Sequence, residues 1–341
     1  MIYLDYAATN PFTKYPCSKY GTFLNPNANY AYKEQKLLDE CANRVKMAIG
    51  AKDGKVVFGG TSSQLIENLL GQLGDDTMII GSVYEHDSVA GFTNQMDDID
   101  GIKDTIQNPP FEYQLIVCLM GVNNVTGDIM PIEEIGKLCK EHNAFFVCDM
   151  TAMIGKAPIP ANIDQWCDCA MWSGHKLGTE LCIGAMWLSD KFNDWLGDFK
   201  LHGTPNLAGA MAVADATEDA CKSPMKHYAD LYMYLYGKLV NANIQFQVIS
   251  NRLKTCAINA IIFDDINADS LQQYLASKQI YIGIGGSACS SLHDFRVLNA
   301  CGLTNDEASH VVRVSFGDET TEHDIDEFVN AVVEYKEKFV R

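Results

Sequence analysis

The segment Ser173-Gly174-His175-Lys176 points to chemistry more directly than any other part of the sequence. It follows an apolar run at residues 169–172, which predicts a buried strand. Partial burial removes water from an ammonium group and makes the amine a usable nucleophile toward a carbonyl. Pyridoxal phosphate (PLP) is the carbonyl cofactor that forms a Schiff base with such a lysine. Taken alone, the segment is more typical of an ordinary exposed loop lysine.

Other apolar runs also end in polar side chains, and three of these could serve the same cofactor. Asp149 follows the run at 145–148, and an ionised carboxylate there could hold a protonated pyridine nitrogen or could cap a helix. Ser62 and Ser63, together with Thr61, could bind a phosphate at a helix start or act as a plain N-cap. His86 could stack on an aromatic ring and transfer protons, or be a solvated loop histidine.

Two residues late in the chain suggest a substrate and a second nucleophile. Cys289 lies between small residues, Gly285-Gly286-Ser287-Ala288 and Ser290-Ser291, which suits an accessible thiol on a loop. Its alternative is one more inert cysteine. Arg313 lies inside an apolar run at 311–315, where its guanidinium could clamp a carboxylate or form a structural ion pair.

The elements around these residues predict an α/β fold. Short apolar runs alternate with amphipathic helical segments, a pattern typical of a mainly parallel sheet covered by helices on both faces. Ligands bind beyond the carboxyl ends of strands in such sheets, where these polar residues fall. After Pro224 the pattern changes to a long amphipathic helix and short mixed strands, which indicates a smaller α+β domain.

Composition and charge exclude several classes of function. The chain has 341 residues and a formal net charge of −18, which argues against a nucleic-acid partner. No apolar stretch is long enough for a membrane span, and the first residues do not read as an export signal. The twelve cysteines mostly sit in apolar runs without zinc-ligand spacing, so we expect no metal and a cytoplasmic, reducing location.

Taken in order, these motifs resemble the cysteine desulfurases, a branch of the fold type I PLP enzymes grouped with class V aminotransferases. The resemblance covers nearly the whole chain, and its most specific pieces are Ser173-Gly174-His175-Lys176 and Gly286-Ser287-Ala288-Cys289. It implies a large PLP-binding domain at 13–224 with a seven-stranded sheet. It also implies a small domain formed by 1–12 and 225–341 that carries the cysteine loop.

The resemblance further implies a role for each site residue. Lys176 would bind PLP as a Schiff base. Asp149 would pair with the pyridine nitrogen of PLP, and His86 would stack on its ring. Phosphate contacts would come from Ser62, Ser63, Ser173 and His175, and from Thr204 acting on the neighbouring subunit of a homodimer with shared active sites. Asn124 and Arg313 would bind the carboxylate of L-cysteine. Cys289 would take the sulfur as a persulfide, leaving alanine, and pass it to an acceptor protein such as an iron–sulfur cluster assembly partner.

The sequence departs from the family pattern at three places. Ala152 replaces the usual glutamine three residues after the aspartate. The phosphate loop reads Gly-Thr-Ser-Ser-Gln where the family usually has Ser-Gly-Gly-Thr-Glu, so the pattern does not identify which hydroxyl binds the phosphate. The stretch after Cys289 is short, and so is the segment between Lys176 and Thr204. The alternatives on the same scaffold are a class V aminotransferase, a cysteine or selenocysteine lyase, and a partner-binding protein with degraded activity.

Overall fold

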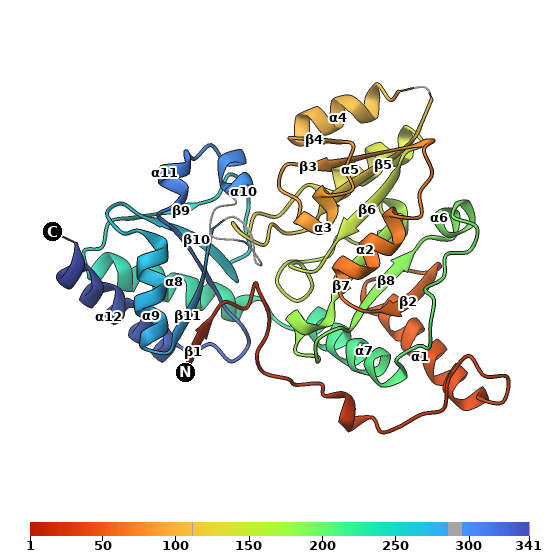
Figure 1. The fold of residues 1–341 in the computed structure, drawn as a ribbon, viewed down its shortest axis with the longest axis horizontal. Coiled ribbons are helices and arrows are strands. Elements are labelled where there is room, and N and C mark those ends of the chain that lie inside the picture. Colours follow the sequence, from red (N-terminus) through yellow and green to blue (C-terminus); the bar gives the residue numbers. More distant parts are fainter. Residues whose placement is uncertain (111, 286–294, 341) are drawn as a thin grey trace. The chain divides into compact units, whose positions relative to one another are not determined.

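The computed structural model describes residues 1–110, 112–285 and 295–340, and it divides the chain into two compact units. The larger unit contains Pro11–Gly121 and Met130–Ser223. The smaller unit joins Met1–Asn10 and Val122–Ile129 to the described residues from Pro224 onward. The short segment 122–129 therefore packs with residues distant from it in the sequence (Figure 1).

The larger unit is built on a seven-stranded sheet with the order β2-β8-β7-β6-β5-β3-β4. Its strands are β2 (Lys55–Gly59), β3 (Thr77–Ser82), β4 (Gln95–Asp97), β5 (Gln114–Met120), β6 (Phe145–Asp149), β7 (Cys169–Ser173) and β8 (Gly184–Leu188). Of the seven strands described in this sheet, only β8 runs antiparallel to its neighbours, β2 and β7. The other six strands therefore end at one edge, and the expected mainly parallel α/β fold is confirmed.

Helices cover both faces of this sheet. The helices are α1 (Tyr32–Ala48), α2 (Ser62–Leu70), α3 (Asp87–Ala90), α4 (Ile99–Gln107), α5 (Ile132–Glu141), α6 (Asp190–Trp195) and α7 (Leu207–Lys222). One core cluster joins apolar residues of α2, α3 and α6 to alternate residues of the strands, such as Phe145 and Val147. On the other face α5 and α7 pack on the sheet, and α1 lies beside α7 (Figure 1).

Burial on both faces explains why the central strands are continuous apolar runs. In β7, Met171 belongs to the cluster with α2, whereas the indole Nε1 of Trp172 donates to Thr217 Oγ1 of α7 at 3.0 Å. In β6, Phe145 lies in the same cluster and Phe146 contacts Trp166. Because successive side chains point to opposite faces, a strand with two covered faces has no polar positions until its end.

The smaller unit contains a five-stranded sheet with the order β1-β11-β12-β10-β9. Its strands are β1 (Ile2–Leu4), β9 (Phe246–Ile249), β10 (Ile258–Phe263), β11 (Ile280–Ile284) and β12 (Val311–Ser315). Its helices are α8 (Lys226–Asn241), α9 (Ala268–Ser277), α10 (Arg296–Ala300), α11 (Asn305–Ala308) and α12 (Glu322–Phe339). Strand β1 pairs in parallel with β11, and α12 packs against both α8 and α9.

Three strands are not expected from the hydrophobic pattern. They are β1, β4 and β9, and each lies at the edge of a sheet. Edge strands are short and pair on one side only, so they lack the long apolar run that identifies a central strand. Among the described helices, none is both long and apolar enough to cross a lipid bilayer.

Candidate active site

Four strands of the larger unit deliver the candidate residues to one edge of the sheet. Ser62 follows β2, His86 follows β3, Asp149 ends β6, and Lys176 follows β7. Strands β6 and β7 are direct neighbours, and Asp149 pairs in register with Met171. The topology thus brings together residues that the sequence separates by more than a hundred positions.

Lys176 lies in a single turn of 3-10 helix, η3 (Gly174–Leu177), which begins as β7 ends. The Gly174 N–H donates to the Ile183 carbonyl at 2.8 Å. The Gly178 N–H donates to the Gly174 carbonyl and closes the turn. Gly178 has φ +88°, a left-handed conformation that favours glycine. Lys176 is half-buried in this turn.

His175 precedes the lysine and stays neutral over most of the pH range. Burial, together with the positive charges of Lys176 and Lys156, lowers the pKa of His175 to about 4. Lys156 is itself buried, in the loop that follows β6. A neutral imidazole has one N–H donor, which suits a contact with an anionic phosphate.

A pair of serines joins the starts of two turns at the same edge. The Ser62 N–H donates to Ser173 Oγ at 2.8 Å, and the two hydroxyl oxygens are also 2.8 Å apart. Ser62 and Ser63 lie in the first turn of α2, whereas Thr61 forms a capping box with Gln64. Because the Thr61 hydroxyl is used as the helix cap, Ser62 and Ser173 are the better placed phosphate donors.

Asp149 is half-buried at the end of β6, and it is oriented by the backbone that follows. Its Oδ1 accepts the Thr151 N–H at 2.8 Å, while within the described residues its Oδ2 accepts no hydrogen bond. One oxygen therefore caps the following turn, as one of the two interpretations of this residue expects. Ala152, where the resembled family has glutamine, is buried and offers no donor.

His86 is held by the turn that it starts. Its Nδ1 accepts the Ser88 N–H at 3.2 Å, so the proton of the neutral ring lies on Nε2. The preceding residue, Glu85, is almost fully buried, and its Oε1 accepts from Ser82 Oγ at 2.6 Å and from the Met120 N–H at 3.0 Å. Glu85 thus ties the histidine loop to the end of β5, a role that the sequence signalled only as a polar residue after a strand.

These residues fit PLP when tested by their donors and charges. The serine pair lies at the first turn of α2, where backbone N–H groups favour an anion such as phosphate. The carboxylate of Asp149 keeps one oxygen for a protonated ring nitrogen. Lys176 supplies an amine from the turn that follows the neighbouring strand, β7. Among the described residues, no cluster of histidine, cysteine and carboxylate side chains could hold a metal ion.

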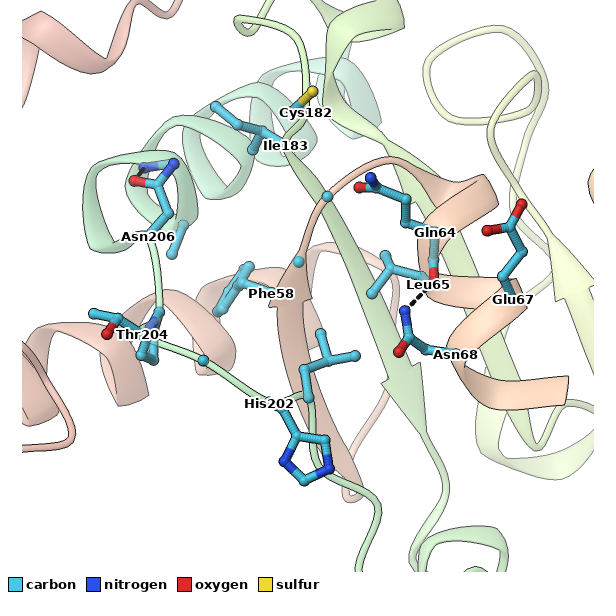
Figure 2. Close-up of a pocket in the computed structure, with 17 residues that line it drawn as sticks. Phe58, Gln64, Leu65, Glu67, Asn68, Cys182, Ile183, His202, Thr204 and Asn206 are labelled. Atoms are coloured by element: carbon cyan, nitrogen blue, oxygen red, sulfur yellow. Dashed lines mark hydrogen bonds between the residues drawn. The ribbon is translucent and has the colours of Figure 1, made fainter. Parts of the chain in front are cut away.

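Thr204 lies in a different place from the serine pair and the lysine. It is exposed on the loop before α7, and it lines a pocket of about 590 Å³ between that loop, β2 and the start of α2 (Figure 2). Other labelled residues of this pocket include Phe58, Gln64, His202 and Asn206. Within the described part of the chain, Ser62, Ser173 and Lys176 do not line it.

The smaller unit holds Arg313 inside strand β12. Its side chain is 2% exposed, its Nη2 bonds Asp5 Oδ1 at 2.6 Å, and its Nη1 donates to the Asn124 carbonyl at 3.0 Å. Its Nε is buried without a partner among the described residues. The structural ion pair is therefore present, and one donor of the guanidinium remains unused. Asn124 is buried in the same unit, and Cys289 lies outside the described residues.

A family model identifies the chain as a whole. The model described as "Aminotransferase class-V" matches residues 2–201 and 197–328, which is nearly the full length. The chain belongs to the class-V aminotransferase family. This family typically uses PLP, in agreement with the lysine, aspartate and serine pair described above.

Relatives of known name are cysteine desulfurases at low identity. Cysteine desulfurase IscS of Rickettsia felis is 26% identical, with 97% of this chain and 90% of that protein aligned. The NifS-like protein from Rickettsia africae superposes with a TM-score of 0.85 at 21% identity over 99% of both chains. An apo cysteine desulfurase from Thermococcus onnurineus has a TM-score of 0.76 at 18% identity, and the match covers 98% of this chain and 94% of that one. These likenesses confirm the resemblance and the fold.

Proposed function

We propose that this class-V family member is a PLP-dependent L-cysteine desulfurase. The observation that carries the proposal is the placement of Lys176, Asp149 and the Ser62–Ser173 pair at one edge of the sheet. Cys289 in the sequence and the similarity to proteins named cysteine desulfurase direct the choice of substrate. A class V aminotransferase would use the same cofactor residues but has no need of a thiol.

Each residue at the sheet edge has a separate task. When bound, PLP would supply an electron sink that stabilises negative charge on the substrate carbon. Ser62, Ser63, Ser173 and His175 would hold its phosphate, and Asp149 would keep its ring nitrogen protonated. His86, with the proton on Nε2, would lie against the ring and donate or accept protons. Lys176 would move the proton between substrate and product carbon.

The sulfur transfer balances without an added oxidant. The thiolate of Cys289 would attack the substrate sulfur, so that an S–S bond forms as the C–S bond breaks. The electrons and a proton remain with the carbon skeleton, which leaves as alanine, while Cys289 carries the persulfide. A sulfur-acceptor protein would then remove the terminal sulfur.

Arg313 would recognise the carboxylate of cysteine, with Asn124 beside it in the same unit. The unused Nε of Arg313 supports this role, because a buried donor without a partner is costly unless a ligand occupies it. Asp5 and the Asn124 carbonyl hold the other two nitrogens, so the guanidinium is already oriented. Preorganised donors of this kind bind a carboxylate with little loss of side-chain entropy.

We also propose a homodimer with shared active sites. Thr204 is exposed, and the described residues that line its pocket exclude the Ser62–Ser173 pair. If Thr204 contacts a cofactor phosphate, that phosphate belongs to a neighbouring subunit. Sedimentation of the purified protein should give twice the monomer mass, and a monomer with bound cofactor would contradict the shared site.

The decisive experiment is to identify the products from L-cysteine. The purified protein should be yellow with PLP, and L-cysteine with a reductant should yield alanine and sulfide in equal amounts. Pyruvate with ammonia would instead identify a lyase, and accumulation of pyridoxamine phosphate would identify an aminotransferase. Selenocysteine in place of cysteine tests the remaining alternative.

The carrier thiol is tested by substitution. Cys289→Ser should abolish sulfide and alanine release while the yellow cofactor remains bound. Cys256→Ser is the matched control, because Cys256 is a half-exposed cysteine of the same unit. Unchanged alanine release by Cys289→Ser would reject Cys289 as the sulfur carrier.

A further inference from the structure

The turn that carries Lys176 is held from outside by a segment far away in the sequence. We call residues 14–20 the strap. The N–H groups of Lys14 and Tyr15 both donate to the Gly178 carbonyl, at 2.8 and 3.0 Å, and the Cys17 N–H donates to Glu180 Oε1 at 3.1 Å. The strap thus contacts the glycine that closes the lysine turn, two residues after Lys176.

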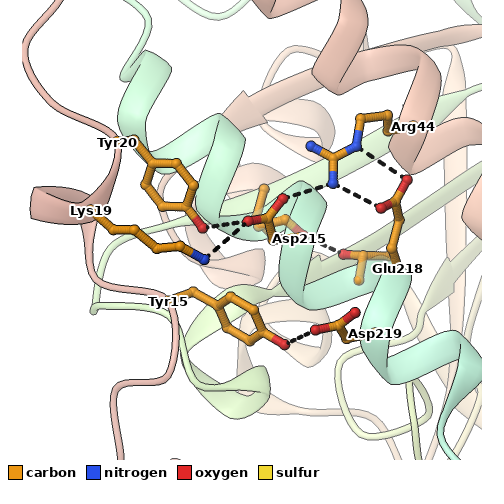
Figure 3. A network of polar contacts seen from close by, with 9 residues as sticks. Tyr15, Lys19, Tyr20, Arg44, Asp215, Glu218 and Asp219 are labelled. Carbon is orange, nitrogen blue, oxygen red and sulfur yellow. Dashed lines mark hydrogen bonds and ion pairs between the residues drawn. The ribbon is translucent and has the colours of Figure 1, made fainter.

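The strap is itself fastened to helix α7 by two tyrosines (Figure 3). The Tyr15 hydroxyl donates to Asp219 Oδ2 at 2.5 Å, and the Tyr20 hydroxyl donates to Asp215 Oδ2 at 2.8 Å. The Tyr15 side chain is buried against small residues of α7, and Leu177 of the lysine turn packs on the same cluster. A hydrogen bond to a carboxylate is stronger than one between neutral groups, so each tyrosine is a firm attachment.

Helix α1 completes the network through Arg44. Its Nη2 bonds Asp215 Oδ1 at 2.7 Å and Glu218 Oε2 at 2.8 Å, while its Nε donates to Glu218 Oε1 at 3.1 Å (Figure 3). Burial alone would raise the pKa of Asp215, but the hydrogen bonds from Arg44 and Tyr20 outweigh it and lower the pKa. Both carboxylates therefore stay charged at neutral pH, and the network persists there.

The network is connected to the turn that carries Lys176. It joins the strap, α1 and α7, and the strap in turn donates to the Gly178 carbonyl and to the Glu180 side chain, both shortly after Lys176. The turn η3 has few internal constraints, since it is a single 3-10 turn closed by one left-handed glycine. The strap bonds to Gly178 and Glu180 thus support this turn from a segment outside it.

We propose that the strap, held on α7 by its Tyr15–Asp219 and Tyr20–Asp215 hydrogen bonds, is a positioning device for Lys176. Arg44 of α1 supports it by holding Asp215 in place. These residues touch neither cofactor nor substrate, and they act by holding the backbone of the lysine turn. The inference rests on the proposed function, because Lys176 needs a defined position only if it reacts with the cofactor. It extends that function by naming residues that control the reactivity of the lysine.

The structural half of the proposal is tested without cofactor. Hydrogen exchange of the amides at 177–180 in the cofactor-free protein should be about tenfold faster in Asp215→Ala, since bonds to a charged group are lost. Tyr15→Phe, which removes one hydroxyl and keeps the ring in place, should give a smaller acceleration. The matched control is Lys103→Met, which breaks the 2.6 Å ion pair with Glu134 elsewhere in the same unit. Equal exchange in Asp215→Ala and the control would overturn the proposal.

The functional half is tested by adding PLP to the cofactor-free proteins. Asp215→Ala should form the yellow, lysine-linked cofactor about tenfold more slowly than the wild type, and kcat should fall while KM for cysteine is retained. Borohydride reduction and peptide mapping then show that Lys176 is the attachment site. Attachment and kcat equal to those of Lys103→Met would overturn the positioning role.

A failure of the proposed function and a failure of the positioning role of the strap give different results. If the wild type never attaches PLP to Lys176, the proposed function fails and the role of the strap in cofactor chemistry fails with it. If the wild type attaches PLP normally and Asp215→Ala does so at the same rate, only the strap proposal fails. Slower attachment with faster exchange at 177–180 supports both.

Discussion

The two units present their functional groups in different ways. In the larger unit Lys176, Asp149 and His86 lie at or just beyond the ends of strands, and all three are half-buried. In the smaller unit Arg313 lies within a strand, is 2% exposed, and forms an ion pair with Asp5. A side chain at the end of a strand can therefore be replaced without disturbing the packed core. A charged side chain inside a buried strand is itself part of that core. The comparison predicts that function and stability are separable in the larger unit and coupled in the smaller one.

The largest effect is expected from Lys176→Ala. Turnover of L-cysteine should fall by about a thousandfold or more, since a proton-transfer group and the cofactor attachment are lost together. The free energy of unfolding of the cofactor-free protein should change by less than about 1 kcal/mol, because the side chain is half-exposed. Chemical denaturation and product assays measure the two quantities. Lys137→Ala, which removes an exposed lysine of α5, is the control, and a large loss of stability in Lys176→Ala would break the comparison.

Arg313→Met should lower both activity and stability. Removing the guanidinium leaves the Asp5 carboxylate and the buried Asn124 carbonyl without their donor, at a cost of about 3–5 kcal/mol in the free energy of unfolding. The double variant Asp5→Leu Arg313→Met should recover much of the stability, because no charge is then left unpaired. Urea denaturation of the single and double variants checks this. A double variant no more stable than the single one would show that the pair is not the source of the loss.

Gly283→Ala sharpens the comparison by crowding the pair while leaving both charges in place. Gly283 lies opposite Arg313 in the sheet, and a Cβ there would come within 2.8 Å of both Arg313 Nη2 and Asp5 Oδ1. We expect a loss of about 1–3 kcal/mol, typical of overpacking in a tight core. The KM for cysteine should rise with little change in kcat, since the guanidinium is displaced from its oriented position. A rise in thermal stability of Gly283→Ala would show that the sheet accommodates the methyl group.

The smallest effect concerns the pH dependence of His175. Its pKa is lowered from 6.5 to about 4 in the folded protein, so the unfolded chain binds a proton more readily between these values. Stability should therefore rise with pH across this window, with about one proton taken up on unfolding at its centre. His175→Gln in the cofactor-free protein should flatten this part of the profile. Thermal denaturation from pH 4 to pH 7 gives the comparison, and parallel profiles for the two proteins would contradict the assignment.

Much of the larger unit could be predicted from the sequence for a physical reason. Strands β6 and β7 are covered on both faces, so their apolar runs are continuous and the polar residue that ends each run marks the edge of the sheet. This is why Asp149 and Lys176 could be assigned to one edge before any coordinates were known. The positions of Ser62 and Ser173 followed in the same way, although their mutual hydrogen bonds did not.

The contacts between distant segments could not be predicted in this way. Arg313 had two equal interpretations, and its partner Asp5 lies 308 residues earlier in the chain. The strap meets the lysine turn across more than 160 residues through backbone groups, which carry no sequence signal. Hydrophobic periodicity reports the burial of a segment but not the identity of its neighbour. Long-range polar pairing is thus the part of the site that required the structure.

The parallel pairing of β1 with β11 also has a consequence for the order of events during synthesis. Ile2 aligns with Ile280, so β1 is synthesised long before its partner strand β11. The strands of the larger unit all lie before Ser189, and its sheet can therefore assemble earlier, because domains generally fold as units during translation. Closure of the smaller sheet is then a late, high-contact-order step.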